Sequence, residues 1–506
     1  MNKTRFLSII MLAAFLLGAM SQPINAAGKT KKREFRGAWI QCVNGQFQGL
    51  GTSQMQATLV KQLDELQRDG INAIIFQVRA ECDALYQSKY EPWSRFLTGT
   101  QGLAPSPYWD PLQWMIEQCH RRGMELHAWV NPYRAKTKGT TALATNHIAM
   151  RRPDLVFTYD SQYILNPGIA ENRNYICTVI ADIVRRYDID GLHIDDYFYP
   201  YPVAGVPIPD QREYQLYNKN SLSLGDWRRS NVDRFIKQLS DTIHAAKPWV
   251  KFGVSPFGIF RNASTAPGVG SRTSGLQNYD DLYANILLWV NNGWIDYCVP
   301  QLYWEIGHKA ADYKELIQWW NRNAGGRPLY IGEDVLRTVK APDPNNPNQH
   351  QLPAKHRLYD QAENVQGTVL WYAAAVVDNP GNYAGTLRSN YWRSPALQPA
   401  MPFIDDKAPR KPGGMKVRKM DDGYYLFWKE PKGKGWKDEP YKYVVYRAEG
   451  TVAPNLDDPS NIVAITSFPL VKLNGYKDGN KKYTYVVTAL DRMSNESSGK
   501  KKKIKL

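Results

Sequence analysis

Short runs of β-branched and aromatic residues alternate along this chain with stretches whose apolar residues have helical spacing. The alternation begins near residue 34 and continues to about residue 400. Leu59, Leu63 and Leu66 recur at i, i+4 and i+7, and Gly70 follows where such a helix would end. A second clear helix is predicted over residues 226–247.

Eight strands are predicted between these helical stretches: Glu34–Gln41, Asn72–Arg79, Glu125–Asn131, Gly191–Asp195, Lys251–Ser255, Tyr297–Tyr303, Pro328–Gly332 and Gly367–Tyr372. Eight β/α units in succession predict an α/β fold, a (β/α)8 TIM barrel spanning residues 33–400.

The predicted loops differ in length at the two ends of these strands. Long loops rich in Pro, Gly, Tyr and Asn follow the third, fourth, fifth and seventh strands, at residues 132–169, 197–224, 256–275 and 333–348. The returns at the other end, such as residues 69–71 and 121–123, are short. Barrel enzymes place their sites in the loops after the strands, so this asymmetry predicts a functional face there.

The C-terminal part of the chain has a different pattern. A Pro-rich linker is predicted at residues 401–414, and residues 415–506 contain the strand-like runs Tyr424–Trp428, Tyr441–Arg447 and Tyr483–Ala489. Turn signals such as Asp421-Asp422-Gly423 and Lys477-Asp478-Gly479 separate them. This spacing predicts a small all-β, immunoglobulin-like sandwich after the barrel.

Composition and charge narrow the class of protein. Of the 506 residues, 43% are hydrophobic and 22% are charged, which excludes disordered, collagen-like and fibrous proteins. The net charge of +16 is concentrated in residues 407–506, where 22 Lys and Arg stand against 11 Asp and Glu. This favours attraction of the C-terminal module to an anionic envelope surface or polymer, not a nucleic-acid enzyme. The alternative is that these lysines only form solvent-exposed faces of the module and bind no partner.

The first 26 residues have the pattern of a signal peptide. Lys3 and Arg5 precede an apolar run, and Ala26 offers a small residue for cleavage, which predicts export to the periplasm or beyond. No Cys follows the run within a few residues, so a lipoprotein is not expected, and no later run of 18 apolar residues predicts a transmembrane segment. The five cysteines include no C-x-x-C pair, so no zinc ribbon is expected.

The segment 190–200, Asp-Gly-Leu-His-Ile-Asp-Asp-Tyr-Phe-Tyr-Pro, carries the strongest chemical signal. If the apolar residues of this strand face the outer helices, alternation turns His193, Asp195 and then Tyr197 toward the barrel interior and mouth. A carboxylate in that position is partly desolvated and is costly unless it is paired or functional. Asp196 is the weaker candidate because the same alternation points it away.

A second carboxylate, Glu305, follows the sixth predicted strand. Alternation puts Gln301, Tyr303 and Glu305 on one face, so Glu305 and Asp195 are expected to converge on one cleft. Two carboxylates, one protonated and one ionised, are the minimal apparatus for glycosidic hydrolysis. We assign Asp195 as nucleophile or base and Glu305 as general acid, whose pKa Trp304 or Tyr303 would raise by excluding water.

Other polar and aromatic residues are predicted to surround the mouth, where sugars bind by stacking on aromatic faces and by hydrogen bonds to planar side chains. The candidates for substrate binding are Trp39, Arg79, Asp83, Asn131, Arg134, His193, Tyr197, Arg261, Gln301, Tyr303, Trp304, Glu333 and Trp371. No P-loop, dinucleotide-binding or G-x-S-x-G motif is present, and no H-E-x-x-H pair supports a metal at His127 and His193. No cofactor and no metal are therefore expected.

Several motifs in order resemble the bacterial glycosyl-hydrolase-like 10 family over roughly residues 33–400. They are Phe35-Arg-Gly-Ala-Trp39, Phe76-Gln-Val-Arg79, Asp83-Ala-Leu-Tyr86, Glu91-Pro-Trp-Ser94, His127-Ala-Trp-Val-Asn-Pro-Tyr-Arg134, the run 190–200 and Val254-Ser-Pro-Phe-Gly258. The family is a group of exported (β/α)8 proteins that includes a division-site hydrolase of peptidoglycan glycan strands stripped of their stem peptides. The resemblance implies a glycan of alternating N-acetylglucosamine and N-acetylmuramic acid, a polyanion that the basic module would suit.

Two further likenesses refine this expectation. The C-terminal region resembles a fibronectin type III module through Trp428 and the runs 441–446 and 483–487, and such modules usually act as spacers or docking surfaces. Residues 190–195 are similar to the fourth-strand motif of chitinase-type barrels, whose acid is a Glu two residues after the last Asp. Tyr197 occupies that position here, so the substrate-assisted mechanism of chitinases does not transfer directly.

The sequence thus predicts an exported glycoside hydrolase that cleaves O-glycosyl bonds in peptidoglycan glycan or a related amino-sugar polysaccharide. Two alternatives stay open: a non-catalytic scaffold that binds envelope glycan, and a hydrolase of a different polysaccharide. Linkage, stereochemical outcome and the identity of the acid are also open at this point.

Overall fold

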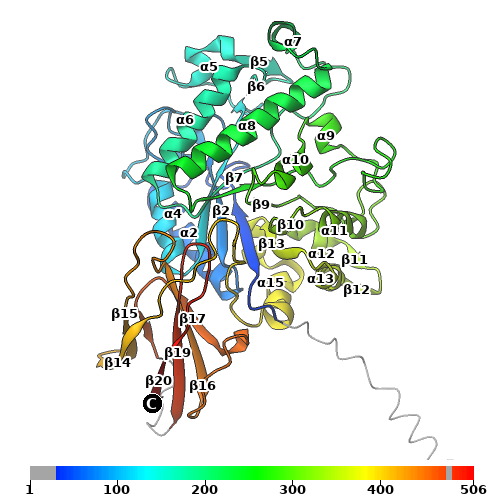
Figure 1. Cartoon of the computed structure of the whole chain (residues 1–506). Coiled ribbons are helices and arrows are strands. Elements are labelled where there is room, and N and C mark those ends of the chain that lie inside the picture. The colour runs from blue at the N-terminus through cyan, green and yellow to red at the C-terminus, as the bar shows by residue number, and fades with distance from the viewer. Residues whose placement is uncertain (1–29, 474–480) are drawn as a thin grey trace, which may run out of the picture.

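A closed barrel of eight parallel strands forms the centre of the computed structural model, which describes residues 30–473 and 481–506 (Figure 1). The strands follow one another around the barrel in chain order. They are β1 (Phe35–Ile40), β2 (Ala73–Arg79), β3 (Glu125–Val130), β7 (Gly191–Ile194), β8 (Lys251–Val254), β9 (Tyr297–Cys298), β10 (Leu329–Asp334) and β13 (Val365–Trp371). The predicted TIM barrel is confirmed. The predicted signal peptide, 1–26, and the turn at 477–479 lie outside the described residues.

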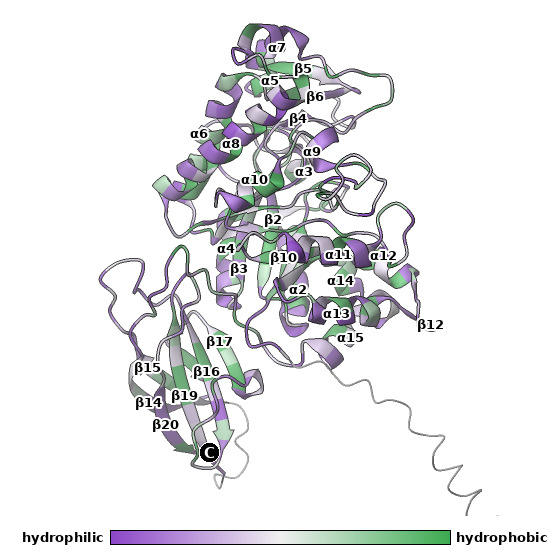
Figure 2. Cartoon of the chain, turned by 45° about the vertical axis from the view of Figure 1, so that its right-hand side comes forward, coloured by the Kyte–Doolittle hydropathy of each residue, from purple (hydrophilic) through white to green (hydrophobic). Residues whose placement is uncertain are grey.

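Helices surround the barrel and turn their apolar stripes toward it. The principal ones are α2 (Thr52–Arg68), α4 (Pro111–Arg121), α6 (Ala170–Arg186), α8 (Leu224–Ala246), α10 (Ile286–Asn291), α11 (Tyr313–Arg322), α13 (Leu352–Gln361) and α14 (Ala373–Asp378). The predicted helices around Leu59 and over 226–247 are α2 and α8, and both hydrophobic and hydrophilic colours run along α8 in Figure 2. Within the described residues, no helix is long and apolar enough to span a membrane.

Large aromatic rings fill the barrel interior beside glycines on neighbouring strands. The ring of Tyr297 lies 1.9 Å from where a Cβ would stand on Gly253, and the ring of Trp39 lies 3.1 Å from the same point on Gly332. Only glycine leaves room for these rings without a shift of the strands. The lower part of the barrel is therefore a packed core beneath the mouth.

The long loops carry small elements of their own at the C-terminal end of the strands. The loop after β3 contains the antiparallel sheet β4 (Arg134–Lys136), β6 (Gln162–Leu165) and β5 (Val156–Tyr159), with the short helix α5 (Ile148–Arg151). The loop after β7 contains α7 (Gln211–Tyr217), and the loop after β10 contains α12 (Val335–Lys340), β11 (Pro342–Asp343) and β12 (Asn346–His350). In Figures 1 and 2, α5, β5, β6 and α7 lie at the end of the molecule opposite the C-terminal sheets.

Two antiparallel sheets form the C-terminal module, residues 413–506. One contains β14 (Gly413–Met420), β15 (Gly423–Lys429) and β18 (Leu470–Lys472), and the other contains β17 (Ile462–Thr466), β16 (Lys442–Glu449), β19 (Lys482–Leu490) and β20 (Lys500–Lys505). Leu426, Trp428 and Val487 belong to one buried apolar cluster between them. The all-β region predicted after the barrel is confirmed.

The C-terminal module packs directly on the N-terminal end of the barrel. The Tyr441 hydroxyl donates a hydrogen bond to Asp190, just before β7, at 2.6 Å, and lies 2.8 Å from Nε2 of His120 at the end of α4. Burial alone would raise the pKa of Asp190, but His120, Lys442 and the neighbouring Arg492 hold it well below its usual range. These buried polar contacts join the module to the barrel.

Replacing Tyr441 with Phe tests this contact. The substitution leaves the buried Asp190 with one hydrogen bond fewer, so we expect the free energy of unfolding in urea to fall by about 1–3 kcal/mol. Tyr425→Phe is the matched control, because the Tyr425 hydroxyl donates to the exposed Asp422, at 2.9 Å. Equal stability of the two variants would contradict a structural role for the Tyr441 contact.

Candidate active site

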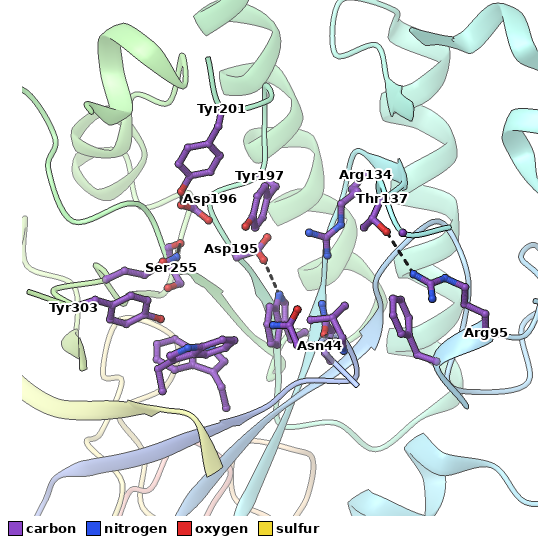
Figure 3. Close-up of a pocket in the computed structure, with 18 residues that line it drawn as sticks. Asn44, Arg95, Arg134, Thr137, Asp195, Asp196, Tyr197, Tyr201, Ser255 and Tyr303 are labelled. Carbon is purple, nitrogen blue, oxygen red and sulfur yellow. Dashed lines mark hydrogen bonds between the residues drawn. The ribbon is translucent and has the colours of Figure 1, made fainter. Parts of the chain in front are cut away.

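The C-terminal end of the barrel opens into a cavity of about 480 Å³ (Figure 3). Residues from six of the barrel strands or their ends, and from the loops above them, surround it. They are Trp39, Val43, Asn44, Gln77, Arg95, Phe96, Trp129, Arg134, Thr137, Gly139, Asp195, Asp196, Tyr197, Tyr201, Ser255, Gln301, Tyr303 and Trp371. The lining combines aromatic walls with a small set of charged groups, as in many ligand sites.

Asp195 lies in this cavity directly after β7 and is held by one of its two oxygens. Trp129 Nε1 donates a hydrogen bond to Asp195 Oδ2 at 3.1 Å, and Asn131 Nδ2 donates to the same oxygen at 2.5 Å. The other oxygen, Oδ1, is buried and has no hydrogen-bond partner among the described residues. A buried carboxyl oxygen without a partner is costly, so a ligand that hydrogen-bonds it would gain affinity.

The environment of Asp195 favours its protonated form. Burial, and next the negative charge of Asp196, raise the pKa of Asp195 to about 7, although Arg134, Trp129 and Asn131 act in the opposite direction. At neutral pH this carboxyl group therefore exists in both forms. A carboxylic acid that keeps its proton near pH 7 is suited to donate it to a leaving group.

Asp196 lines the same cavity, although strand alternation predicts that it points away. Its carboxylate accepts a hydrogen bond from the Tyr201 hydroxyl, and Gln301 also bonds it. Burial raises its pKa, and these donors and Arg134 oppose the rise. The expectation failed because β7 ends at Ile194, so the two aspartates follow a non-strand backbone that turns both carboxylates inward.

Glu305 does not line the cavity, so the expected convergence of Asp195 and Glu305 is not observed. The strand β9 ends at Cys298; alternation still places Gln301 and Tyr303 at the cavity, but beyond Tyr303 the chain bends and Glu305 is turned elsewhere. The charge of Glu305 instead acts on the buried Lys355, whose pKa it helps to raise against desolvation. The second carboxylate of the cavity is Asp196.

The predicted residues that do line the cavity are Trp39, Arg134, Asp195, Tyr197, Gln301, Tyr303 and Trp371. Two others lie beneath it and position its lining. Asn131 holds Asp195, as described above. His193 Nε2 accepts a hydrogen bond from Trp39 Nε1 at 3.4 Å, and its Nδ1 lies 3.1 Å from the Tyr297 hydroxyl.

Three predicted binding residues contact other parts of the fold instead of the cavity. The guanidinium of Arg79 is fully buried and pairs with Glu91 at 2.6 Å. Asp83 accepts a hydrogen bond from the backbone nitrogen of Glu81 at 3.0 Å. Trp304 packs edge-to-face on the ring of Phe257, with 5.3 Å between the ring centroids. These contacts hold the loops that frame the cavity.

The remaining two predicted residues form pairs outside the lining. Arg261 forms an ion pair with Asp280 at 2.8 Å. The carboxylate of Glu333 accepts a hydrogen bond from the Tyr313 hydroxyl at 2.6 Å, in the space between β10 and α11. Both were expected in loops after strands; Arg261 does lie in the loop after β8, whereas Glu333 lies within β10, and the side chains of both join elements of the fold.

Comparison with known proteins identifies the family. Residues 34–351 match the family model described as Glycosyl hydrolase-like 10. The chain belongs to this family. The glycosyl hydrolase YngK of Bacillus subtilis (strain 168) is 40% identical over 511 residues, covering 99% of this chain and 98% of that relative. The glycosyl hydrolase DigH of Escherichia coli (strain K12) is 35% identical over 372 residues, covering 70% of this chain and 80% of DigH.

A solved structure with a likeness to this chain is the PgaB (BpsB) glycoside hydrolase domain from Bordetella bronchiseptica. It is 13% identical, with a TM-score of 0.44, over 71% of this chain and 99% of that domain. The family match and the relatives YngK and DigH support the assignment of this protein as a glycosidase.

In this family member, part of the lining was not singled out from the sequence: Val43, Asn44, Gln77, Arg95, Phe96, Trp129, Thr137, Gly139, Tyr201 and Ser255. Alternation would have found Gln77, Trp129 and Ser255, because each shares a strand face with a residue that points inward. Arg95 begins the four-residue helix α3 (Arg95–Thr98) in the loop after β2, and Thr137 lies in the loop after β3; both segments are too irregular to give a periodic signal.

Replacing Asp195 with Asn tests its raised pKa through stability. The folded pKa of about 7 lies above the ordinary value of 3.8, so the wild-type protein loses stability as the pH rises from about 4 to 7. We expect the Tm of D195N to exceed that of the wild type by roughly 3 °C at pH 8, and the difference to shrink at pH 5. Asp241→Asn, at an exposed carboxylate on α8, is the control. A D195N difference that does not vary with pH would contradict the raised pKa.

Proposed function

We propose that this protein hydrolyses glycosidic bonds in peptidoglycan glycan strands from which the stem peptides have been removed. The observation that carries the proposal is the carboxylate pair in the cavity, Asp195 and Asp196, of which one is protonated near neutral pH. Hydrolysis of a glycosidic bond requires one carboxyl group that gives a proton and a second that is ionised.

The hydrogen bonds of the pair suggest a role for each member. Trp129 and Asn131 bind Oδ2 of Asp195, so Oδ1 carries the proton and delivers it to the glycosidic oxygen of the leaving sugar. Asp196, assigned here as the ionised member, stabilises the positive charge that develops at the anomeric carbon. A water then adds to that carbon and gives its proton to Asp196, so the glycosidic C–O bond is replaced by a bond to the water oxygen. This proposal replaces the roles inferred from sequence, in which Asp195 was nucleophile or base and Glu305 the acid.

The aromatic walls supply the binding surface that a sugar requires. Trp371 lies edge-to-face with Trp39 at 6.1 Å and nearly parallel to Tyr303 at 6.3 Å between ring centroids. Tyr197, 37% exposed, stands across the cavity. Pyranose rings present apolar C–H faces, which stack on such rings while their hydroxyls reach the polar groups.

The choice of glycan and location draws on the rest of the chain. The family resemblance implies peptide-stripped peptidoglycan, and the predicted signal peptide at 1–26 supports export to the compartment where peptidoglycan lies. We further propose a barrel domain at 33–400, a linker at 401–414 and a fibronectin type III-like module at 415–506. The three- and four-stranded sheets of this module support that type, and its excess positive charge supports attraction to an anionic envelope surface or polymer.

Substitutions of the carboxylates test the proposal. On purified peptide-free strands, with products read by mass, D195N and D196N should each lower kcat/KM by about 10²–10⁴-fold. Glu305→Gln is the matched control and should stay close to wild type, because Glu305 does not line the cavity. Loss of activity in E305Q with activity retained in D196N would restore the pair inferred from sequence.

The same assay separates the rival functions. Tight binding of peptide-free strands without new reducing ends would favour a glycan-binding scaffold. Cleavage of other polysaccharides, with no product from peptidoglycan strands, would favour a hydrolase with a different substrate.

The pH profile provides an independent test of the acid. If Asp195 is the acid, kcat/KM should fall as the pH rises above about 7, where Asp195 loses its proton. Asn131→Ala removes a donor that stabilises the ionised form, so the alkaline limb should move to higher pH. If the alkaline limb of the kcat/KM profile has the same midpoint in N131A as in the wild type, Asp195 is not the acid.

A further inference from the structure

We propose that Arg95 and Arg134, called here the arginine side of the cavity, bind a carboxylate carried by the sugar next to the scissile bond. In the peptidoglycan substrate this group is the lactyl carboxylate of muramic acid, which is free only when the stem peptide is absent. The inference rests on the proposed function and assigns the residues that give it selectivity for stripped strands.

The arginine side lies next to the aspartates in the same cavity. In Figure 3, Arg134 stands between Asp195 and the pair Arg95–Thr137, so the two guanidinium groups extend from the aspartates along one wall. A glycan with one ring over Asp195 would therefore place a substituent of a neighbouring ring near the arginines.

Arg134 is anchored in a fixed orientation. Its Nε donates to the carbonyl oxygen of Ala80 at 3.0 Å, and its Nη2 donates to Asn131 Oδ1 at 2.8 Å. Its guanidinium also lies over the ring of Tyr197 at 4.9 Å. Because these contacts settle its geometry before a ligand arrives, little side-chain entropy is lost on binding.

Arg95 is anchored in a similar way from behind. Its Nε donates to Glu81 at 3.2 Å and to Thr140 at 2.9 Å, and Nη2 lies 3.4 Å from Thr137 Oγ1. Its side chain is 26% exposed and stacks on the ring of Phe96. Glu81 therefore accepts a hydrogen bond from Nε of Arg95. A ligand carboxylate would instead bind the terminal Nη1 and Nη2 atoms, through which arginine can donate two parallel hydrogen bonds.

The positive charges of the arginine side are partly compensated from behind. With Asp195 protonated, the lining residues carry two positive charges, on Arg95 and Arg134, against one negative charge on Asp196. Glu81 lies behind Arg95, and its oxygens also accept hydrogen bonds from Thr137 and Thr140. With Glu81 counted, these charges already balance, so a ligand carboxylate would be bound through directed hydrogen bonds from the guanidinium groups and not through an excess of positive charge.

This arrangement discriminates by chemistry. A stem peptide converts the lactyl carboxylate into an amide, which has no charge and cannot accept two parallel hydrogen bonds from one guanidinium. Glycans made only of N-acetylglucosamine lack the group entirely. The arginine side would therefore disfavour both.

Arg95→Gln tests the inference, because Arg134 also lowers the pKa values of both aspartates and its loss would disturb the chemistry itself. Peptide-free strands are compared with the same strands whose lactyl carboxylates are converted to methylamides. We expect the wild type to favour the free carboxylate in kcat/KM by about tenfold or more, and R95Q to lose most of this ratio. Lys138→Gln, an exposed lysine outside the lining that pairs with Asp160, should keep the ratio.

A merely structural role of Arg95 would lower kcat/KM on both strands and leave their ratio unchanged, which would overturn the inference. A wild-type ratio near one would overturn it as well. If the wild type cleaves neither strand, the proposed function fails, and calorimetric affinities for the two strand types still test the arginine side. Equal affinities would then reject it, whereas a preference for the free carboxylate that R95Q lacks would support it.

Discussion

The burial of two adjacent carboxylates at the mouth of the barrel is the constraint on which the rest of the site depends. Removing a charge from water is expensive, and two like charges in contact cannot both be kept. The fold eases this conflict by raising the pKa of Asp195 to about 7, so that the carboxyl group is partly protonated at neutral pH, and by supplying Arg134 as a nearby positive charge. Trp129 and Asn131 fix one oxygen of Asp195, and Tyr201 and Gln301 bond Asp196.

Beneath this pair, buried polar side chains form a hydrogen-bond network along the barrel axis, which holds the residues of the cavity floor in place. Below His193, the Tyr297 hydroxyl lies 2.7 Å from Nδ1 of His127, whose Nε2 lies 3.0 Å from Glu125. Glu125 pairs with Lys251 at 2.6 Å, close to the end of the barrel on which the C-terminal module packs. Burial lowers the pKa of His193, so this ring stays neutral and serves to orient Trp39 in the cavity wall. The module, the barrel core and the cavity are thus parts of one packed body.

Periodicity was a sound guide wherever the backbone is a hydrogen-bonded strand, and it failed where the strands end. The eight strands and helices α2 and α8 were predictable, because burial on a parallel barrel imposes a strong apolar pattern. Beyond the ends of β7 and β9, at Ile194 and Cys298, alternation still held for Asp195, Gln301 and Tyr303, but it misplaced Asp196 and Glu305 because no strand pairing fixes the backbone there. Arg95 reaches the cavity from a loop whose path depends on contacts such as that with Glu81, and no local pattern encodes such a contact.

Placing both carboxylates on one strand end has a consequence for how the rest of the mouth is used. The relative position of Asp195 and Asp196 is set by one short stretch of backbone, not by the spacing between two strands of the barrel. The ends of β1 and β13, and the chain beyond β9, are then left to provide the aromatic wall of Trp39, Trp371 and Tyr303. The long loops after β2 and β3 contribute Arg95 and Arg134. In the function proposed here, the carboxylate pair and most of the binding wall therefore come from different segments, and Arg134 is the wall residue whose charge also acts on both aspartates.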